Sequence, residues 1–489
     1  MIMFAEYVFK QAEAEYNKKL LLIDADSLDS VTHYSEYFEQ QGFQVIQYYD
    51  DLHFRIDCDA VMRDQTQKYL LIAKPDAYIP YDVLRQFHRF TVTVNDLFPK
   101  LSSSTLKSTP NLNYDLLTIA YEQNYQDLTA PQATLRFNED TVYGKTNVEK
   151  YARILLAQMN EAEKRATTYR DWFVISNIKA AIDVFSTQYD LNIDSEQEQQ
   201  AFVDFILANF GKLSTAMDKT SPVLVSRAME FMHDHSDKFA IIMMDGMSQF
   251  DWKIISESFS GVNYHKADVY AMIPTTTSIS RQCLLSNKYP SQLNSPWTQS
   301  QEKKEFTECA LQMGYLPAQI GYERGYDAEF SNAVKCAAII IIDVDEMVHG
   351  QKQGRIGMLN DITVLTKQQK LLKLTERLLK KGFDVYITAD HGNTPCTGMG
   401  KLVGTGVDVE TKSRRMLVLK DFADKQAMLT KYNLIEYPKY YLNKGYDYLL
   451  CGPGKSFDSK GEQVMNHGGI TIDEVIVPFI SIKAGDNNG

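Results

Sequence analysis

The feature that most constrains the fold is an unbroken apolar run that ends abruptly in an acid and a glycine. Residues Ala240 to Met244 are all apolar, and Asp245 and Gly246 follow them directly. An apolar block of this length is typical of a strand buried on both faces of a parallel sheet. A carboxylate at the carboxyl end of such a strand lies where open α/β sheets bind ligands. We therefore expect Asp245 to face a ligand or a metal ion, although most Asp-Gly pairs only form turns.

A second buried strand is predicted from Ala338 onward, and it also ends in acids. Asp343 and Asp345 both follow the apolar run, and His349 comes four residues after Asp345. Residues at i and i+4 share one face of a helix, so Asp345 and His349 can converge if a helical turn begins there. This spacing favours Asp345 over Asp343 as the partner of His349, and leaves Asp343 as the alternative. An acidic segment with a nearby His is more often a solvated surface.

Two further segments carry histidines next to glycines. The apolar strand that begins at Val385 ends in Asp390, His391 and Gly392, and His467 is followed by two glycines. Adjacent Asp-His-Gly after a buried strand is much more specific than a single Asp. Glycines allow the loop backbone to turn sharply and to approach a metal ion.

Hydroxyl groups follow another predicted strand, which ends at Pro274. Thr275, Thr276, Thr277 and Ser278 lie where a helix should begin. A helix N-terminus offers free N–H groups and favours phosphate. Ser and Thr are also common N-caps, but a cap needs one hydroxyl, so the others leave room for a nucleophile.

Together these segments supply three Asp, three His and one Thr, nearly all at strand ends. This mixture of hard and borderline ligands suits zinc, with manganese as the second choice. Seven ligands exceed one tetrahedral site and fit two sites that share a bridge. Two metal ions a few Å apart can activate a nucleophile and bind a phosphoryl oxygen.

Composition narrows the class of protein. A net charge of −12 argues against a polyanion-binding surface over the whole molecule. The six cysteines are scattered without a CxxC pattern, which argues against a disulfide framework and fits a reduced, cytoplasmic compartment. We see no signal peptide and no apolar stretch long enough to span a membrane.

The periodicity of the 489 residues changes twice, which predicts three domains. Residues 1–128 alternate strand and helix signals and predict a small, Rossmann-like α/β domain. Residues 129–236 show helical spacing and predict a bundle that links two α/β parts, with no cluster that suggests chemistry. Strand–helix alternation returns over 237–489, where we expect a long helix at 359–381 and an exposed polar loop at 296–308.

The amino-terminal domain carries one acidic pair. Asp24 and Asp26 follow the first predicted strand and resemble the acidic pair of a response-regulator receiver. Because no later strand carries an obvious phospho-acceptor Asp, a docking or recognition domain is the favoured interpretation.

The order Asp-Gly, Pro-Thr-x-Thr, Asp-x-x-x-His, Asp-His-Gly and His-Gly-Gly resembles the alkaline phosphatase superfamily. The closest form is the PglZ domain of BREX phage-defence systems. The stretches from Tyr48 to Arg55 and from Val94 to Lys100 also resemble BREX-type PglZ proteins. The resemblance implies an alkaline-phosphatase-like core with a mainly parallel sheet flanked by helices, preceded by the small α/β domain and the bundle.

The resemblance also assigns roles to residues. It implies that Asp245, Asp390 and His391 hold one zinc ion and that Asp345, His349 and His467 hold the other. The nucleophile, which also binds metal, would be Thr277, three residues after Pro274. A covalent intermediate on Thr277 would then be displaced in line by water. Arg281 could neutralise developing charge, although packing or solvent exposure is the commoner role for such a residue.

We thus expect a two-zinc phosphohydrolase that acts on a phosphodiester or nucleotide, or on nucleic acid, in company with other BREX-type proteins. The rival hypothesis is a non-catalytic scaffold or adaptor of a defence complex, in which the metal site is structural. A phosphomutase would need a cap domain inserted within the metal-binding fold, whereas the predicted helical region precedes it.

Overall fold

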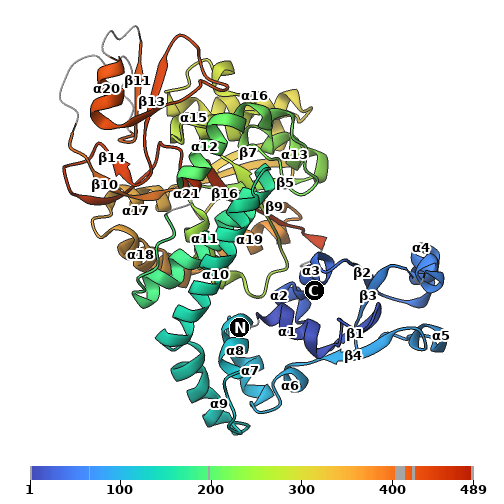
Figure 1. Ribbon diagram of the computed structural model, residues 1–489. Coiled ribbons are helices and arrows are strands. Elements are labelled where there is room, and N and C mark those ends of the chain that lie inside the picture. The colour runs from blue at the N-terminus through green and yellow to red at the C-terminus, as the bar shows by residue number, and fades with distance from the viewer. Residues whose placement is uncertain (1–2, 65, 197–198, 402–412, 421–424, 486–489) are drawn as a thin grey trace. The chain divides into compact units, whose positions relative to one another are not determined.

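The computed structural model describes residues 3–64, 66–196, 199–401, 413–420 and 425–485. Contacts within the chain divide it into two compact units, Met1–Tyr151 and Ala152–Gly489 (Figure 1). Helix α10, Lys145–Arg165, crosses this division. The division into three domains at residues 128 and 236 stays a prediction, and each unit is described here by itself.

The first unit contains a four-stranded parallel sheet in the order β2-β3-β1-β4. The alternating strand and helix signals of this part of the sequence predicted such a sheet. The strands are β1 (Lys19–Asp24), β2 (Phe43–Tyr48), β3 (Lys68–Ala73) and β4 (His88–Val92). The helices are α1 (Phe4–Gln11), α2 (Asp29–Thr32), α3 (Tyr34–Gln40), α4 (Asp51–Arg63), α5 (Tyr81–Leu84), α6 (Val94–Leu97), α7 (Ser103–Ser108), α8 (Tyr114–Tyr121) and α9 (Pro131–Phe137).

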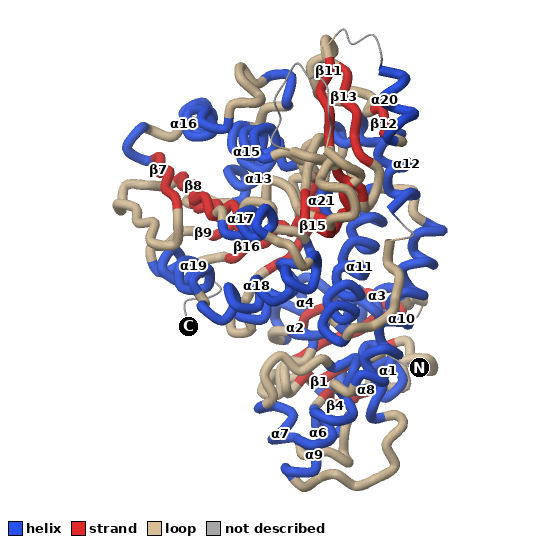
Figure 2. Tube along the Cα trace, turned by 90° about the vertical axis from the view of Figure 1, so that its left-hand side faces the viewer, coloured by secondary structure: helices blue, strands red, loops and turns tan. Residues whose placement is uncertain are grey.

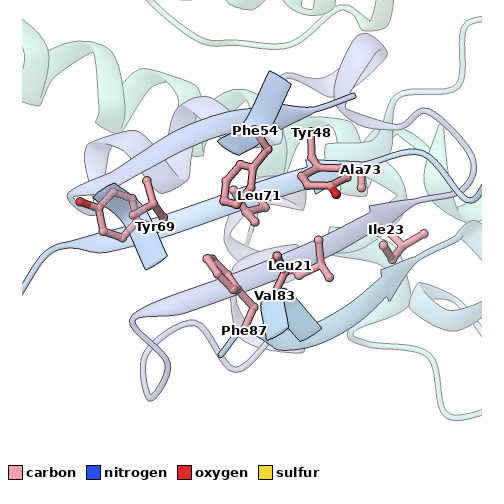
Figure 3. Close-up of a cluster of buried hydrophobic side chains, with 10 residues drawn as sticks. Leu21, Ile23, Tyr48, Phe54, Tyr69, Leu71, Ala73, Val83 and Phe87 are labelled. Carbon is pink, nitrogen blue, oxygen red and sulfur yellow. The ribbon is translucent and has the colours of Figure 1, made fainter. Parts of the chain in front are cut away.

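One face of this sheet forms an apolar core. Leu21 and Ile23 on β1 and Tyr69 and Leu71 on β3 point to the same side, because alternate residues of a strand share a face. Figure 3 shows these side chains packed with Phe54 and others from the covering helices.

The acidic pair of this unit is used within the fold. Asp24 is buried and accepts hydrogen bonds from the backbone N–H groups of Leu28 and Asp29, at 2.9 and 2.8 Å. Asp26 forms an ion pair with Lys107, at 2.6 Å. Both carboxylates therefore stabilise the loop that follows β1.

The second unit is built on a six-stranded sheet in the order β6-β16-β9-β5-β8-β7. Its strands are β5 (Phe239–Met244), β6 (His265–Tyr270), β7 (Ile320–Arg324), β8 (Cys336–Ile341), β9 (Asp384–Thr388) and β16 (Ile476–Ile482). β9, β5, β8 and β7 pair in parallel, whereas β16 is antiparallel to both of its neighbours. All residues of β5 and β8 are buried, as their apolar runs predicted. The predicted mixed α/β fold with a mainly parallel central sheet is confirmed.

Helices flank this sheet (Figure 2). They are α11 (Tyr169–Tyr189), α12 (Gln199–Asn209), α13 (Ala228–His235), α14 (Gln249–Ile255), α15 (Thr277–Ser286), α16 (Glu302–Gln312), α17 (Asp343–Gly350), α18 (Gly354–Gln368), α19 (Lys370–Lys380) and α21 (Ile472–Val475). Over the part of the chain that the structure describes, no helix combines the length and apolar character needed to cross a bilayer.

Two predictions about helices in this unit were wrong. The long helix expected at 359–381 is two helices, α18 and α19, because Gln369 between them adopts a left-handed conformation with φ of 54°. The polar stretch 296–308 is not all loop, since α16 begins at Glu302, whose side chain is buried. Glu302 and Glu305 in that stretch form ion pairs with Arg281 and Lys288, which come before the stretch in the sequence.

A lobe lies between His391 and His467, and of its strands the sequence predicted only one, at 415–420, which is β11. Its elements are β10 (Thr394–Gly398), β11 (Met416–Leu419), α20 (Lys425–Tyr432), β12 (Leu434–Glu436), β13 (Asp447–Cys451), β14 (Lys455–Ser456) and β15 (Gln463–Asn466). They form two three-stranded sheets, β14-β10-β15 and β11-β13-β12. In both Figure 1 and Figure 2, β11, β13 and α20 lie together. The lobe lies within the metal-binding fold, whereas the sequence analysis considered only the helical region that precedes this fold.

A buried charge network joins α11 to the rest of the second unit, in a region where we expected no cluster. Lys179 has no exposed surface and contacts Asp183, Glu196 and Asp473 at 2.8, 3.1 and 3.1 Å. The ligand atoms of these three acids lie within 4.8 Å of one another. Arg355 also pairs with them, so two cations already offset most of the charge of the three carboxylates. The network is a set of salt bridges that holds α11 against α21.

We expect Lys179→Met to destabilise the protein by about 3–5 kcal/mol, because it leaves buried carboxylates with one cation fewer. The change should appear as a lower midpoint in calorimetric or denaturant unfolding. Lys164→Met is the control, since Lys164 forms only an exposed pair with Glu161, and its cost should stay below about 1 kcal/mol. Equal effects of the two substitutions would contradict a stabilising role for the buried network.

Candidate metal centre and nucleophile

The predicted site segments meet at one edge of the six-stranded sheet. Asp245, Asp345 and Asp390 follow the carboxyl ends of the parallel strands β5, β8 and β9. Because β16 runs in the opposite direction, the loop that carries His467 and leads into β16 reaches the same edge. Sheet topology thus gathers residues that are far apart in the sequence.

The first ligand group consists of Asp245, Asp390 and His391, all buried. The Nε2 atom of His391 lies 3.9 Å from Asp245 Oδ1 and 3.9 Å from Asp390 Oδ2. Asp245 Oδ1 is buried and has no hydrogen-bond partner among the described residues. A buried carboxylate oxygen without a partner is costly unless a cation occupies the space that it faces.

The second ligand group consists of Asp345, His349 and His467. His467 Nε2 lies 3.3 Å from Asp345 Oδ1, and His349 Nε2 lies 3.4 Å from Asp345 Oδ2. The two histidine Nε2 atoms are 3.5 Å apart. His349 is exposed, so this group opens to solvent while the first is enclosed. Asp343, the alternative ligand, interacts instead with Tyr326.

The two groups are neighbours. The rings of His391 and His467 stack with their centroids 4.2 Å apart and an angle of 15° between their planes. Residues of both groups could therefore face the same ligand.

Each of these histidines directs one nitrogen at the backbone. The Nδ1 atoms of His391 and His467 lie 3.0 Å from the carbonyl oxygens of Gly392 and Thr275, respectively. A carbonyl oxygen only accepts, so each Nδ1 carries the proton and each Nε2 presents its lone pair to the ligand group. A hydrogen bond from the other ring nitrogen fixes the tautomer in which a histidine binds a metal ion.

The helix that follows β6 begins at Thr277. Hydrogen-bond geometry shows which hydroxyl of the cluster faces the ligand residues. Thr277 Oγ1 donates to His391 Nε2 at 3.0 Å. Thr275 Oγ1 instead donates to the Gly469 carbonyl oxygen, and Thr276 Oγ1 lies 3.4 Å from Ser278 Oγ. Thr277 is thus the hydroxyl that faces the first ligand group.

Arg281 lies one turn further along α15 and is buried rather than exposed. Its guanidinium pairs with Asp245, with Asp390 at 3.4 Å, and with Glu302 at 3.1 Å. Glu302 also accepts a hydrogen bond from the Tyr322 hydroxyl at 2.6 Å. Glu302 therefore holds Arg281 beside the carboxylates of the first group.

The charges of the site perturb its pKa values. Burial and the nearby carboxylate of Asp390 raise the pKa of Asp245 well above its ordinary value, against the effect of Arg281. Burial opposes ionisation of Asp345, but His467 and the other neighbouring histidines lower its pKa overall. Burial lowers the pKa of His391. The three acidic side chains outnumber the one guanidinium, and a bound cation would favour the ionised form of Asp245, so the site is suited to cations.

Two glycines allow the ligand loops to approach their neighbours. A Cβ on Gly392 would collide with the carbonyl oxygen of Asp473. Gly468 has a φ of 109°, and a Cβ there would collide with the Ser413 hydroxyl. The Asp-His-Gly and His-Gly-Gly patterns therefore have a steric reason as well as a chemical one.

Three residues that support the site were not predicted as site residues, namely Glu302, Arg415 and Glu474. Glu474 could have been found, because an acid interrupts the apolar run that follows the His-Gly-Gly motif. Glu302 and Arg415 have charged or polar neighbours in the sequence, and no periodic pattern of apolar residues marks their positions.

Comparison with known proteins supports this picture. The model of a family described as the BREX system PglZ alkaline phosphatase-like domain matches residues 224–482, which is more than half of the chain. This match confirms the resemblance inferred from the sequence motifs. No curated protein matches the chain.

Several solved structures are similar over half of the chain. Human ectonucleotide pyrophosphatase/phosphodiesterase 5 is 14% identical, with a TM-score of 0.37, over 50% of this chain and 89% of its own. Its murine counterpart is 12% identical, with a TM-score of 0.33, over 50% of this chain and 88% of its own. Phosphonoacetate hydrolase from Sinorhizobium meliloti 1021, with phosphonoformate, is 11% identical, with a TM-score of 0.34, over 50% and 90%. At these low TM-scores the similarities add nothing to the fold described above.

Proposed function

This chain belongs to the PglZ family of BREX alkaline phosphatase-like domains, and from that premise we propose that it is a two-zinc phosphohydrolase with Thr277 as its nucleophile. The observation that carries the proposal is the position of Thr277. Its hydroxyl lies 3.0 Å from His391 Nε2, in the first ligand group, and the His391 ring stacks on His467 of the second.

The residues present fit two divalent ions. Asp245, Asp390 and His391 would hold one ion, with Thr277 as a further ligand, and Asp345, His349 and His467 would hold the other. Each group offers carboxylate oxygens and imidazole nitrogens, the mixture that zinc binds. Manganese is the second choice. Bound as a pair, these ions would lower the pKa of the Thr277 hydroxyl and neutralise charge on the phosphoryl oxygens.

The residues of the chain then have distinct roles. Thr277 Oγ1 attacks the phosphorus atom, the bond to the leaving oxygen breaks, and a phosphothreonine ester forms. Water attacks this ester in line, which releases phosphate or a phosphate monoester and restores the hydroxyl. Arg281, held by Glu302, is placed to balance the negative charge that develops on the phosphoryl oxygens. A phosphodiester or nucleotide substrate, nucleic acid included, follows from the family resemblance, as do BREX-type partner proteins. The scattered cysteines fit a cytoplasmic location.

The experiment that tests this proposal combines metal content with turnover. We expect the purified protein to bind two zinc ions per chain and to hydrolyse bis(p-nitrophenyl) phosphate. His467→Ala should bind one ion fewer and lose most turnover, because the second group keeps only two protein ligands. If the wild-type protein binds two ions but hydrolyses neither a diester nor a monoester reporter, the non-catalytic scaffold is the correct interpretation.

A further inference from the structure

We propose that Arg415 and Glu474 are positioning residues, which form a buried pair that holds the His467–Gly468–Gly469 loop at the second ligand group. Arg415 belongs to the inserted lobe, so the pair couples this lobe to the metal centre. The inference rests on the proposed function, because it assumes that His467 binds a metal ion. Its test is therefore based on metal affinity and not on turnover alone.

Glu474 is the anchor of the loop. Its carboxylate is fully buried and accepts a hydrogen bond from the Gly469 N–H at 2.7 Å. The same carboxylate accepts from the Thr471 N–H at 3.1 Å and from the Thr471 hydroxyl at 2.6 Å. Glu474 thus fixes the backbone on both sides of the turn between His467 and β16.

Arg415 neutralises this buried carboxylate. Its Nε and Nη2 atoms donate to Glu474 Oε1 and Oε2 at 2.9 and 3.1 Å, in a bidentate arrangement. The guanidinium is fully buried, and its Nη1 atom donates to the Lys455 carbonyl oxygen within the lobe. A planar bidentate pair fixes direction as well as distance, which a lysine in the same place would not do.

The loop is packed directly against this pair. A Cβ on Gly469 would lie 2.6 Å from Arg415 Nη2 and 2.9 Å from Glu474 Oε2. From the lobe, the Ser413 hydroxyl donates to the His467 carbonyl oxygen at 2.9 Å. On its other side the loop is held by Thr275, which accepts from His467 Nδ1 and from the Gly468 N–H, both at 3.0 Å. Movement of the pair would therefore move the backbone that carries His467.

The first ligand group depends much less on this pair. Asp245 and Asp390 are held by Arg281 and by backbone N–H groups, including that of Gly246 at 3.2 Å from Asp390 Oδ1. Only the backbone of Glu474 contacts this group, because its carbonyl oxygen accepts a hydrogen bond from the Gly392 N–H at 2.9 Å. A change confined to the Glu474 side chain should therefore weaken one metal site and spare the other.

The test is a zinc titration of the full-length protein, by calorimetry and by competition with a chromophoric chelator. In Glu474→Gln, which keeps the size of the side chain and removes its charge, we expect one of the two zinc ions to bind about 10–100-fold more weakly. The other ion should bind within about twofold of wild type. Arg415→Lys keeps the charge but loses the bidentate geometry, and should weaken the same ion.

Glu305→Gln is the matched control. Glu305 is also buried and pairs with Lys288 at 2.5 Å, and neither residue belongs to a ligand group. It should leave both zinc affinities unchanged. In a His467→Ala background, Glu474→Gln should have no further effect on the remaining ion, which identifies the site that the pair supports.

The outcomes separate this proposal from the proposed function. If wild-type protein binds no zinc, the proposed function itself fails, and this inference fails with it. If wild-type protein binds two ions and a folded Glu474→Gln variant binds both normally, or both equally poorly, only the positioning role is wrong. Should Glu474→Gln fail to fold, the affinities measured for Arg415→Lys decide the question by the same criterion.

Discussion

Thr277→Ala should abolish turnover while leaving both metal ions bound. The substitution removes the hydroxyl that attacks phosphorus, and the six Asp and His ligands remain. We expect hydrolysis of a diester reporter to fall by at least about 10³-fold, as is common when a covalent nucleophile is deleted. Zinc content should stay at two ions per chain. The measurement is steady-state hydrolysis with metal analysis of the same sample.

Two variants sharpen this prediction. Thr277→Ser keeps a hydroxyl at the same place and should retain measurable turnover. Ser278→Ala removes the adjacent hydroxyl, which contacts Thr276 rather than His391, and should leave turnover within about twofold of wild type. A fully active Thr277→Ala protein would show that another hydroxyl of the cluster is the nucleophile.

Asp245→Asn should remove one metal ion and nearly all turnover without unfolding the sheet. The amide has the size of the carboxylate but no charge, so the first ligand group loses one of its two anions. Burial raises the pKa of Asp245 well above its ordinary value. A group with a raised pKa contributes stability at low pH that is lost as the pH rises through the folded-state pKa. Without metal, the Asn side chain avoids the cost of ionising a buried Asp245, so the variant should be at least as stable as metal-free wild-type protein at neutral pH.

Zinc-dependent thermal stability is the direct measurement. A ligand stabilises the state that binds it by RT ln(1 + [L]/Kd). Wild-type protein should thus melt at a higher temperature when zinc is added, and Asp245→Asn should show a clearly smaller shift. Asp343→Asn is the control, because the sequence analysis kept Asp343 as an alternative ligand. This variant should show the same zinc-dependent shift as wild type. A normal two-ion content in Asp245→Asn would contradict the assignment of the first group.

Much of the fold could be predicted because burial leaves a local signal. Runs such as Ala240 to Met244 are apolar on both faces, and the structure buries them at the centre of a parallel sheet. The ends of these runs also indicated which acids could lie at the site, because a buried strand ends where a charged residue follows the apolar ones. Glycines after the acids were informative for a steric reason, which the contact between Gly392 and Asp473 makes explicit.

Other features had no local signal. Arg281 is buried only because Asp245, Asp390 and Glu302 surround it, and these partners come from separate parts of the chain. Most strands of the inserted lobe were overlooked because they are short. The break at Gln369 was overlooked because one left-handed residue interrupts an otherwise continuous helical pattern.

The sequence by itself determined which residue types stand at the ends of the strands, and in which order. That order is enough to indicate the family and the seven candidate ligands, since each motif lies within a few neighbouring residues. Only the tertiary structure decided which candidates meet. The start of α17 turns Asp345 rather than Asp343 towards His349 and His467, and the start of α15 turns Thr277 towards His391. The i, i+4 spacing already favoured Asp345 as the partner of His349. The contacts of Asp345 with His467 and of Thr277 with His391 join loops more than a hundred residues apart, which no local pattern encodes.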